Sequence, residues 1–192
     1  MDTQKDNIVK NKISLNIKPV FKLIEINGKE IKIPKMGLQQ HAILSTSESL
    51  EDGVKKLIKS IHPNLSVAER DLVCLHLLAF NKRIKNEIEI DGKTYSVDDV
   101  IICQQLKFDI GDTEYKFKSP TMEIKNPTID MLLKDCCVSV KTNGIKQDIP
   151  DFMKMPAYVY KWVEKICNSI SLKTHKKEIK GLYDLVELFD GS

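Results

Sequence analysis

The sequence predicts an α+β fold, with a helical core, an N-terminal β-hairpin and an inserted antiparallel β-hairpin subdomain. Apolar residues recur at helical spacing in several segments and alternate with charged residues in others. The alternating segments are joined by turn-forming pairs such as Asn-Gly and Asp-Gly. The 192 residues suffice for one domain with a real core, or for one domain with an appendage.

The N-terminal hairpin is predicted where FKLIEI and KEIKI flank the pair Asn27-Gly28. Both turn residues tolerate the positive φ that a two-residue hairpin turn requires. Pro34 should close the second strand, because proline has no backbone N–H to donate. The preceding residues 1–12 are rich in Lys and Asn, and we expect them to form a flexible basic tail.

Two helices are expected after this hairpin. A short one begins at about Gly37, and a clearer one lies within SESLEDGVKKLIKSIHP. The apolar side chains of the second fall on one helical face: Leu50, Val54, Leu57, Ile58 and Ile61. Ser47 or Ser49 can cap this helix, and Pro63 ends it.

The most informative stretch is NLSVAERDLVCLHLLAFNKR, residues 64–83. Ser66 and Glu69 have the spacing of a capping box, which predicts a helix from about Val67 to Asn81. Its apolar residues cover most of the circumference, so the helix is either central to the core or covered by a partner chain. Lys82 and Arg83 suit the negative end of its dipole.

From Ile84 the hydrophobic period switches to two. Two hairpins are predicted, around the turn pairs Asp91-Gly92 and Gly111-Asp112, with a short helix capped by Ser96 between them. Residues 84–120 are therefore expected to form a small β subdomain with one wet face. It would be inserted into a mainly helical core made of residues 13–83 and 121–192.

Three further helices are expected after residue 121, with a hairpin or loop around Asn143-Gly144. The first begins near Thr128 or Ile129. The second spans PAYVYKWVEKICNSI, with Trp162 and Ile170 on its apolar face. The third is KEIKGLYDLVELF, in which Gly181 would lie inside the helix at a cost of about 1 kcal/mol relative to alanine.

Composition excludes several broad classes of function. The net charge of +3 is mild, and aromatic residues are not interleaved with the lysines, so nucleic-acid binding is disfavoured. No apolar run reaches the roughly 18 residues that span a bilayer, and the N-terminus lacks a secretory apolar segment. The five cysteines form no CxxC motif, which favours free thiols in a reducing compartment.

No catalytic, cofactor-binding or metal-binding residues are predicted. His76 with Cys74 invites a Cys-His interpretation, but positions i and i+2 of a helix point in different directions. We interpret His76 as a buried or interfacial ring bonded within the structure. The four histidines are scattered without metal-ligand spacing, and the glycines form no phosphate-binding loop.

Partner contacts are the remaining candidates for function. Trp and Tyr are enriched at binding hot spots, although core packing is the simpler role for such a cluster. The predicted partner-binding residues come from the apolar helix and from the aromatic segment near the C-terminus: Leu75, His76, Phe80, Tyr158 and Trp162.

The order IPKMGLQQHAIL, PNLSVAERDLVCLHLLAFNKR, DVIICQQLKF and YKFKSP resembles the baseplate hub assembly proteins of T-even-type contractile-tailed phages. The similarity covers about residues 30–135. The residues that carry it belong mainly to one block: Leu65, Ser66, Ala68, Glu69, Arg70, Asp71, His76, Leu77, Leu78, Phe80 and Asn81. The resemblance implies a non-enzymatic role in building the hub, to which the tail tube and wedges attach, and it supplies no catalytic residues.

Hub assembly through contacts with other phage tail or baseplate hub proteins, in the host cytoplasm, is therefore the first hypothesis. Whether the protein is then retained in the virion baseplate is left open. A second hypothesis is a tail assembly chaperone, whose sign would be an open groove lined by Leu75, Phe80, Tyr158 or Trp162. A Cys/His enzyme and a nucleic-acid binder acting through the basic arm are further alternatives.

Overall fold

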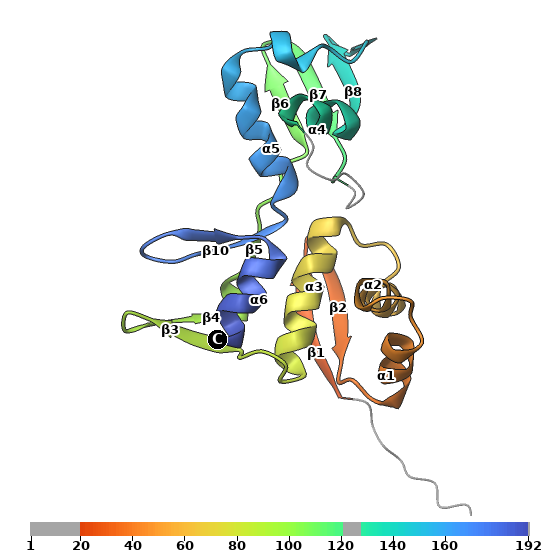
Figure 1. Ribbon diagram of the computed structural model, residues 1–192, viewed down its shortest axis with the longest axis vertical. Coiled ribbons are helices and arrows are strands. Elements are labelled where there is room, and N and C mark those ends of the chain that lie inside the picture. The colour runs from red at the N-terminus through yellow and green to blue at the C-terminus, as the bar shows by residue number, and fades with distance from the viewer. Residues whose placement is uncertain (1–19, 121–127, 192) are drawn as a thin grey trace, which may run out of the picture.

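The computed structural model describes residues 20–120 and 128–191, and their fold is a mixture of helices and small antiparallel sheets (Figure 1). The described residues form six α-helices and eleven short strands. The predicted α+β class is confirmed, as is the N-terminal hairpin. The expected basic tail at 1–12 lies outside the described residues.

The helices are α1 (Leu38–Ser45), α2 (Leu50–Ile61), α3 (Val67–Phe80), α4 (Ile129–Cys136), α5 (Tyr160–Cys167) and α6 (Leu182–Asp190). The strands are β1 (Phe21–Ile26), β2 (Lys29–Pro34), β3 (Glu87–Ile90), β4 (Lys93–Ser96), β5 (Ile101–Ile102), β6 (Lys107–Ile110), β7 (Thr113–Phe117), β8 (Cys137–Thr142), β9 (Ile145–Gln147), β10 (Ile170–Lys173) and β11 (Glu178–Lys180).

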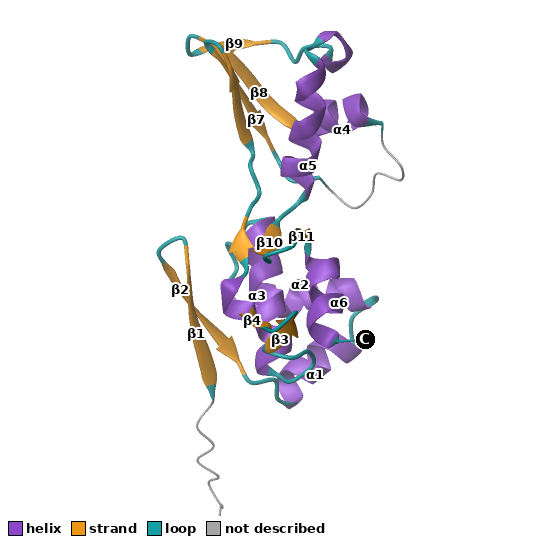
Figure 2. Ribbon diagram, turned by 90° about the vertical axis from the view of Figure 1, so that its left-hand side faces the viewer, coloured by secondary structure: helices purple, strands orange, loops and turns teal. Residues whose placement is uncertain are grey.

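Two hydrophobic clusters divide the described residues into two lobes, which both views show as separate bodies (Figures 1 and 2). The first lobe comprises residues 20–102 and 170–191, the second lobe comprises residues 106–120 and 128–166, and two connecting segments, 103–105 and 167–169, join them. The chain therefore leaves the first lobe once, builds the second, and returns.

The β1–β2 hairpin forms one wall of the first lobe (Figure 2). Asn27 and Gly28 have φ values of 51° and 73°, as expected for a two-residue turn that matches the twist of the strands. Alternation then directs Ile31 and Ile33 into the core, where they are almost fully buried. The hairpin thereby covers one side of helix α3.

Helix α3 is the centre of the first lobe. It starts at the predicted capping box: the Ser66 hydroxyl accepts from the Glu69 backbone N–H at 3.2 Å, and Glu69 Oε2 accepts from the Ser66 N–H at 2.7 Å. The helix contacts α2, α6, β2, β5 and β10. Elements on several sides therefore bury its apolar circumference, and the interpretation of this stretch as a central core helix is confirmed.

Residues 84–120 are divided between the two lobes, which differs from the single β subdomain expected from the sequence. Tyr95 and Val97 are buried in the first cluster, whereas Phe108 and Phe117 are buried in the second. The alternating pattern correctly marked the strands, but it carries no information on which core each strand faces. The short helix expected after Ser96 is a single 3-10 turn followed by β5.

The C-terminal segment also differs from its expected form. Gly181 was expected inside a helix, but it precedes α6 and has a φ of +90°. Ile179 lies in strand β11, which pairs with β10. Ile170 likewise lies in β10 rather than on the helix that contains Trp162. Helix α5 therefore ends before β10 and helix α6 begins after β11, because both strands pair within the sheet β11-β10-β5.

The second lobe is a four-stranded antiparallel sheet, of order β6-β7-β8-β9, with α4 and α5 on one face. Trp162 lies at the centre of this core, with its ring stacked on that of Phe108 at a centroid distance of 4.6 Å. The opposite face carries charged side chains such as Lys107 and Glu114, which form an ion pair. This lobe therefore has its own hydrophobic core.

Candidate interaction surfaces

The buried face of α3 contains three of the five predicted partner-binding residues. The side chain of Leu75 is fully buried, that of His76 is buried and that of Phe80 is partly exposed. Leu75 packs in the first cluster together with residues from the hairpin and from α6. Because Leu75 has no free surface in this fold, only Phe80 offers a partner an accessible apolar side chain here.

His76 is held between two charged residues from other elements. Its Nδ1 accepts from the Lys22 ammonium at 3.3 Å, and Lys22 in turn donates to Asp98 Oδ1 at 2.7 Å. Burial and the adjacent Lys22 charge lower the pKa of His76 to about 4, and the Asp98 carboxylate opposes this only in part. The ring is therefore neutral near pH 7, and it joins β1 to α3 and to the turn after β4.

The nearest cysteine in the chain does not complete a nucleophile with His76. Burial, with a smaller contribution from Asp71, raises the pKa of Cys74 to about 12. Burial also raises the pKa values of Cys136, Cys137 and Cys167. These thiols are protonated at neutral pH, whereas a nucleophilic cysteine requires a lowered pKa.

Glu69 has the most strongly lowered pKa of the described carboxylates. Burial alone would raise it, but the Ser66 backbone N–H, the Lys29 ammonium and the Asn27 amide together hold this pKa at about 2. Lys29 Nζ lies 3.0 Å from Glu69 Oε1, and Asn27 Nδ2 lies 3.2 Å from it. A helix cap thereby also fixes the turn of the β1–β2 hairpin.

The aromatic group predicted near the C-terminus is divided in the structure. Trp162 is buried, whereas the side chain of Tyr158 is 51% exposed. Both belong to the second lobe, so they lie in a different cluster from Leu75. The five predicted residues therefore do not line one open groove, which was the expected sign of a chaperone for an apolar segment.

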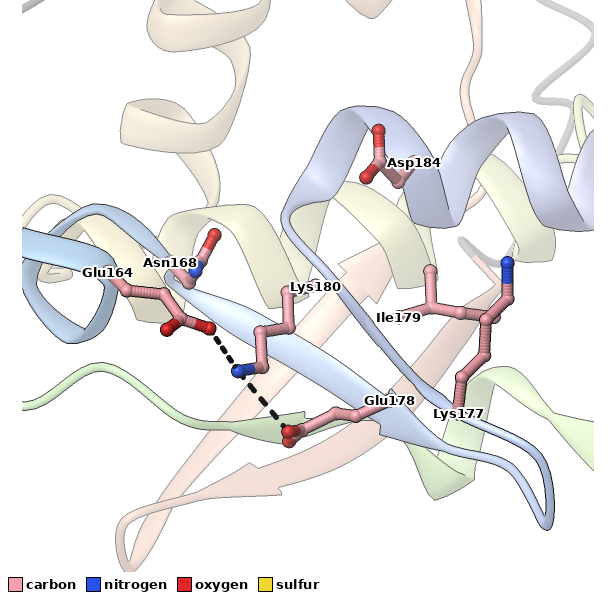
Figure 3. A pocket seen from close by; sticks show the side chains of 7 residues that line it. All are labelled: Glu164, Asn168, Lys177, Glu178, Ile179, Lys180 and Asp184. Carbon is pink, nitrogen blue, oxygen red and sulfur yellow. Dashed lines mark hydrogen bonds and ion pairs between the residues drawn. The ribbon is translucent and has the colours of Figure 1, made fainter. Parts of the chain in front are cut away.

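A polar pocket lies where the second lobe meets the first (Figure 3). Lys180 on β11 bonds to Glu164 on α5 at 2.6 Å and pairs with Glu178 at 3.4 Å. Nearby, Gln104 Nε2 donates to the Ile166 carbonyl oxygen at 2.7 Å. The ion pair between Lys180 and Glu164 therefore joins the two lobes beside this pocket.

A second pocket, of about 680 Å³, lies at the C-terminal end of α3. Its rim carries the basic residues Lys35, Lys82, Arg83 and Lys85. From the sequence, Lys82 and Arg83 were assigned to the helix dipole, and the cluster was not predicted. The closely spaced basic residues at 82–85 were a usable signal, but Lys35 directly follows β2 and joins them only through the fold.

The described ranges, 20–120 and 128–191, offer neither a metal site nor a membrane-spanning helix. They contain no group of three His, Cys, Asp or Glu side chains that could hold a metal ion. Within the same ranges, no helix combines the length and the apolar character that crossing a bilayer requires.

Comparison with known proteins identifies the family. The family described as "Baseplate hub distal subunit" matches residues 33–189. The chain belongs to this family. It is also 38% identical, over 175 residues, to a protein of Enterobacteria phage T4 named "Baseplate hub assembly protein gp28". That match covers 91% of this chain and 97% of the T4 protein, and no solved structure matches.

The family match covers both lobes of this baseplate hub protein. It begins in β2, includes all six helices and ends in α6. The resemblance noted from the sequence covered about residues 30–135, and the match confirms the family and extends the similarity through α5 to α6. Both the central helix and the second lobe are therefore features within the family match.

Proposed function

We propose that this chain is a subunit of the baseplate hub of a contractile-tailed phage, which helps to build the hub by binding other tail proteins. The observation that carries the proposal is the family match over residues 33–189. The name of the T4 relative, a hub assembly protein, supports the same role. The protein is made in the host cytoplasm and acts without catalysis.

The accessible members of the predicted set are the proposed contact residues. Phe80 is partly exposed at the basic pocket, and Tyr158 is exposed on the second lobe. An aromatic side chain buries a large apolar area when a partner covers it, which favours such residues as anchors. In this proposal Leu75, His76 and Trp162 hold the two lobes in shape and contact no partner directly.

We further propose that the protein stays in the finished baseplate. The family description names a distal subunit of the hub, and a subunit persists in the structure that it builds. The two separate cores support this role, because each lobe can hold a different neighbour. A retained subunit of this kind needs stable surfaces rather than an active site.

An amber mutation early in the gene tests the assembly role. Infection of a non-suppressing host should yield heads but no complete tails, as seen by electron microscopy of the lysate. A plasmid copy of the wild-type gene should restore tails, which controls for effects on neighbouring genes. Normal tails from the amber mutant without the plasmid would refute the proposed function.

A further inference from the structure

We propose that the pocket at the C-terminal end of α3 docks an acidic segment of another baseplate protein. An apolar side chain of that segment would sit on the pocket floor. This inference rests on the proposed function and deepens it, because it names the kind of partner that the chain holds and where it binds.

The charge of the pocket is the first observation. Four cationic side chains line it, against a single carboxylate, Asp190. Lys82, Arg83 and Lys85 form no ion pair or side-chain hydrogen bond within the described part of the chain. By contrast, Lys29 pairs with a carboxylate of its own lobe. Cationic side chains that have no partner among the described residues favour an anionic ligand.

The helix dipole does not account for these cations. The last carbonyl groups of a helix carry partial negative charge and attract one or two basic groups. Lys35 already fills this role: its ammonium donates to the Phe80 carbonyl oxygen and lies 4.9 Å from the centre of the Phe80 ring. The negative end of the helix dipole is therefore already balanced by Lys35, and it does not explain the charges of Lys82, Arg83 and Lys85.

The backbone at Lys82 is the second observation. Its N–H donates to the Ala79 carbonyl oxygen and the Arg83 N–H donates to the Leu78 carbonyl oxygen, each at 2.9 Å. This is the Schellman pattern, whose left-handed position is usually a glycine. Lys82 occupies that position with a φ of +58°. A lysine in this left-handed position carries a conformational cost, and its ammonium adds to the positive charge that lines the pocket.

The pocket floor favours a protein segment over a nucleic acid. The apolar residues that line the pocket are Ala79, Phe80 and Ile84, and of these Phe80 is the partly exposed one that can receive an apolar side chain. A site for single-stranded nucleic acid would instead present several aromatic rings for stacking, whereas Phe80 is the one aromatic residue that lines this pocket. An acidic segment with one apolar residue can pair with the basic side chains that line the pocket and cover its apolar residues.

The experiment compares three variants of the full chain, each supplied from a plasmid to the amber mutant. Lys82→Glu/Arg83→Glu/Lys85→Glu reverses the rim. Lys146→Glu/Lys161→Glu/Lys173→Glu reverses three exposed lysines elsewhere and is the matched control. Lys82→Gly removes one rim charge and relieves the left-handed strain, so it should melt no lower than the wild type.

The probe for binding is a synthetic peptide in which Asp and Glu alternate with single Leu residues. The rim reversal should weaken its binding on the order of 100-fold, and Lys82→Gly should weaken it about 2- to 5-fold. The control should bind like the wild type. In infected cells the rim reversal should fail to restore tails, and the control should restore them.

The outcomes separate the two proposals. Normal tails from the amber mutant alone would refute the proposed function. Tails that require the protein but form normally with the rim reversal would overturn only this inference. Should the rim reversal unfold, unchanged peptide affinity of Lys82→Gly would overturn it. Tighter binding of a DNA oligonucleotide through the same lysines would also overturn it.

Discussion

At the scale of single residues, His76 links three elements through charge. Lys22 comes from the first strand and Asp98 from the turn after β4, and both reach the ring at the middle of α3. The sequence predicted a buried histidine bonded within the fold, because an isolated polar group in an apolar helix needs a partner. It could not name these partners, because distant segments of the chain supply them.

Acid should destabilise the protein through His76. In the folded state the ring has a pKa of about 4, whereas the ordinary value is 6.5, so the unfolded chain takes up the proton first. The free energy of unfolding should therefore fall as the pH drops from 6.5 to 4, by up to about 3 kcal/mol from this group. Urea unfolding at several pH values measures this dependence.

His76→Gln provides the comparison for that measurement. Glutamine keeps an acceptor near Lys22 but does not titrate, so the decline between pH 6.5 and pH 4 should be much shallower. His41→Gln changes an exposed histidine and is the matched control, with a decline like that of the wild type. Equal slopes for His76→Gln and the wild type would show that folding does not lower the pKa of His76, and would contradict this prediction.

At the scale of elements, local signals predicted well and pairing signals did not. The capping box at Ser66 and the Asn27-Gly28 turn were readable, because each depends on residues that are adjacent in the chain. Strand β11 and the first residue of β10, Ile170, were predicted as helix, because their few apolar residues also fit a helical period. Antiparallel pairing makes these segments strands, and pairing cannot be predicted from the residues of one segment alone.

Gly181 gives a test whose sign separates the two interpretations. Inside a helix, Gly181→Ala would raise the free energy of unfolding by about 1 kcal/mol. At its observed φ of +90° and ψ of 150°, alanine is strained, and we expect a loss of about 1–3 kcal/mol instead. Thermal or urea unfolding distinguishes a gain from a loss.

The basic pocket also shows what sequence reasoning misses at this scale. Lys82 and Arg83 were correctly placed at the end of a helix, and the expected role was to balance its dipole. The structure adds Lys35, which directly follows β2, and Lys85 from the segment before β3. The cluster exists only because the hairpin brings Lys35 to the end of α3.

At the scale of the whole molecule, two cores are joined by two short connecting segments. Composition and length were compatible with one domain and an appendage, and the sequence placed the appendage at 84–120. In the structure the second lobe comes from 106–120 and 128–166. Helices α4 and α5 complete its core, and no local pattern assigns a helix to one core rather than the other.

The two cores should respond separately to truncation. Trp162→Ala should destabilise the second lobe by about 3–5 kcal/mol, because a large ring is lost from a packed cluster. Hydrogen exchange should then accelerate at α5 and β7 but stay near the wild-type rate at α3. Leu75→Ala should give the converse pattern. Acceleration throughout the chain in both variants would mean that the lobes unfold as one unit.

The measurement that tests the central claim most directly is the protein composition of purified tails. The central claim is that this chain is a structural subunit of the baseplate hub and acts by contact with its neighbours. Quantitative mass spectrometry of purified wild-type tails should find the chain in a fixed ratio to other hub proteins. Complete tails that assemble only in its presence, yet contain none of it, would contradict the account.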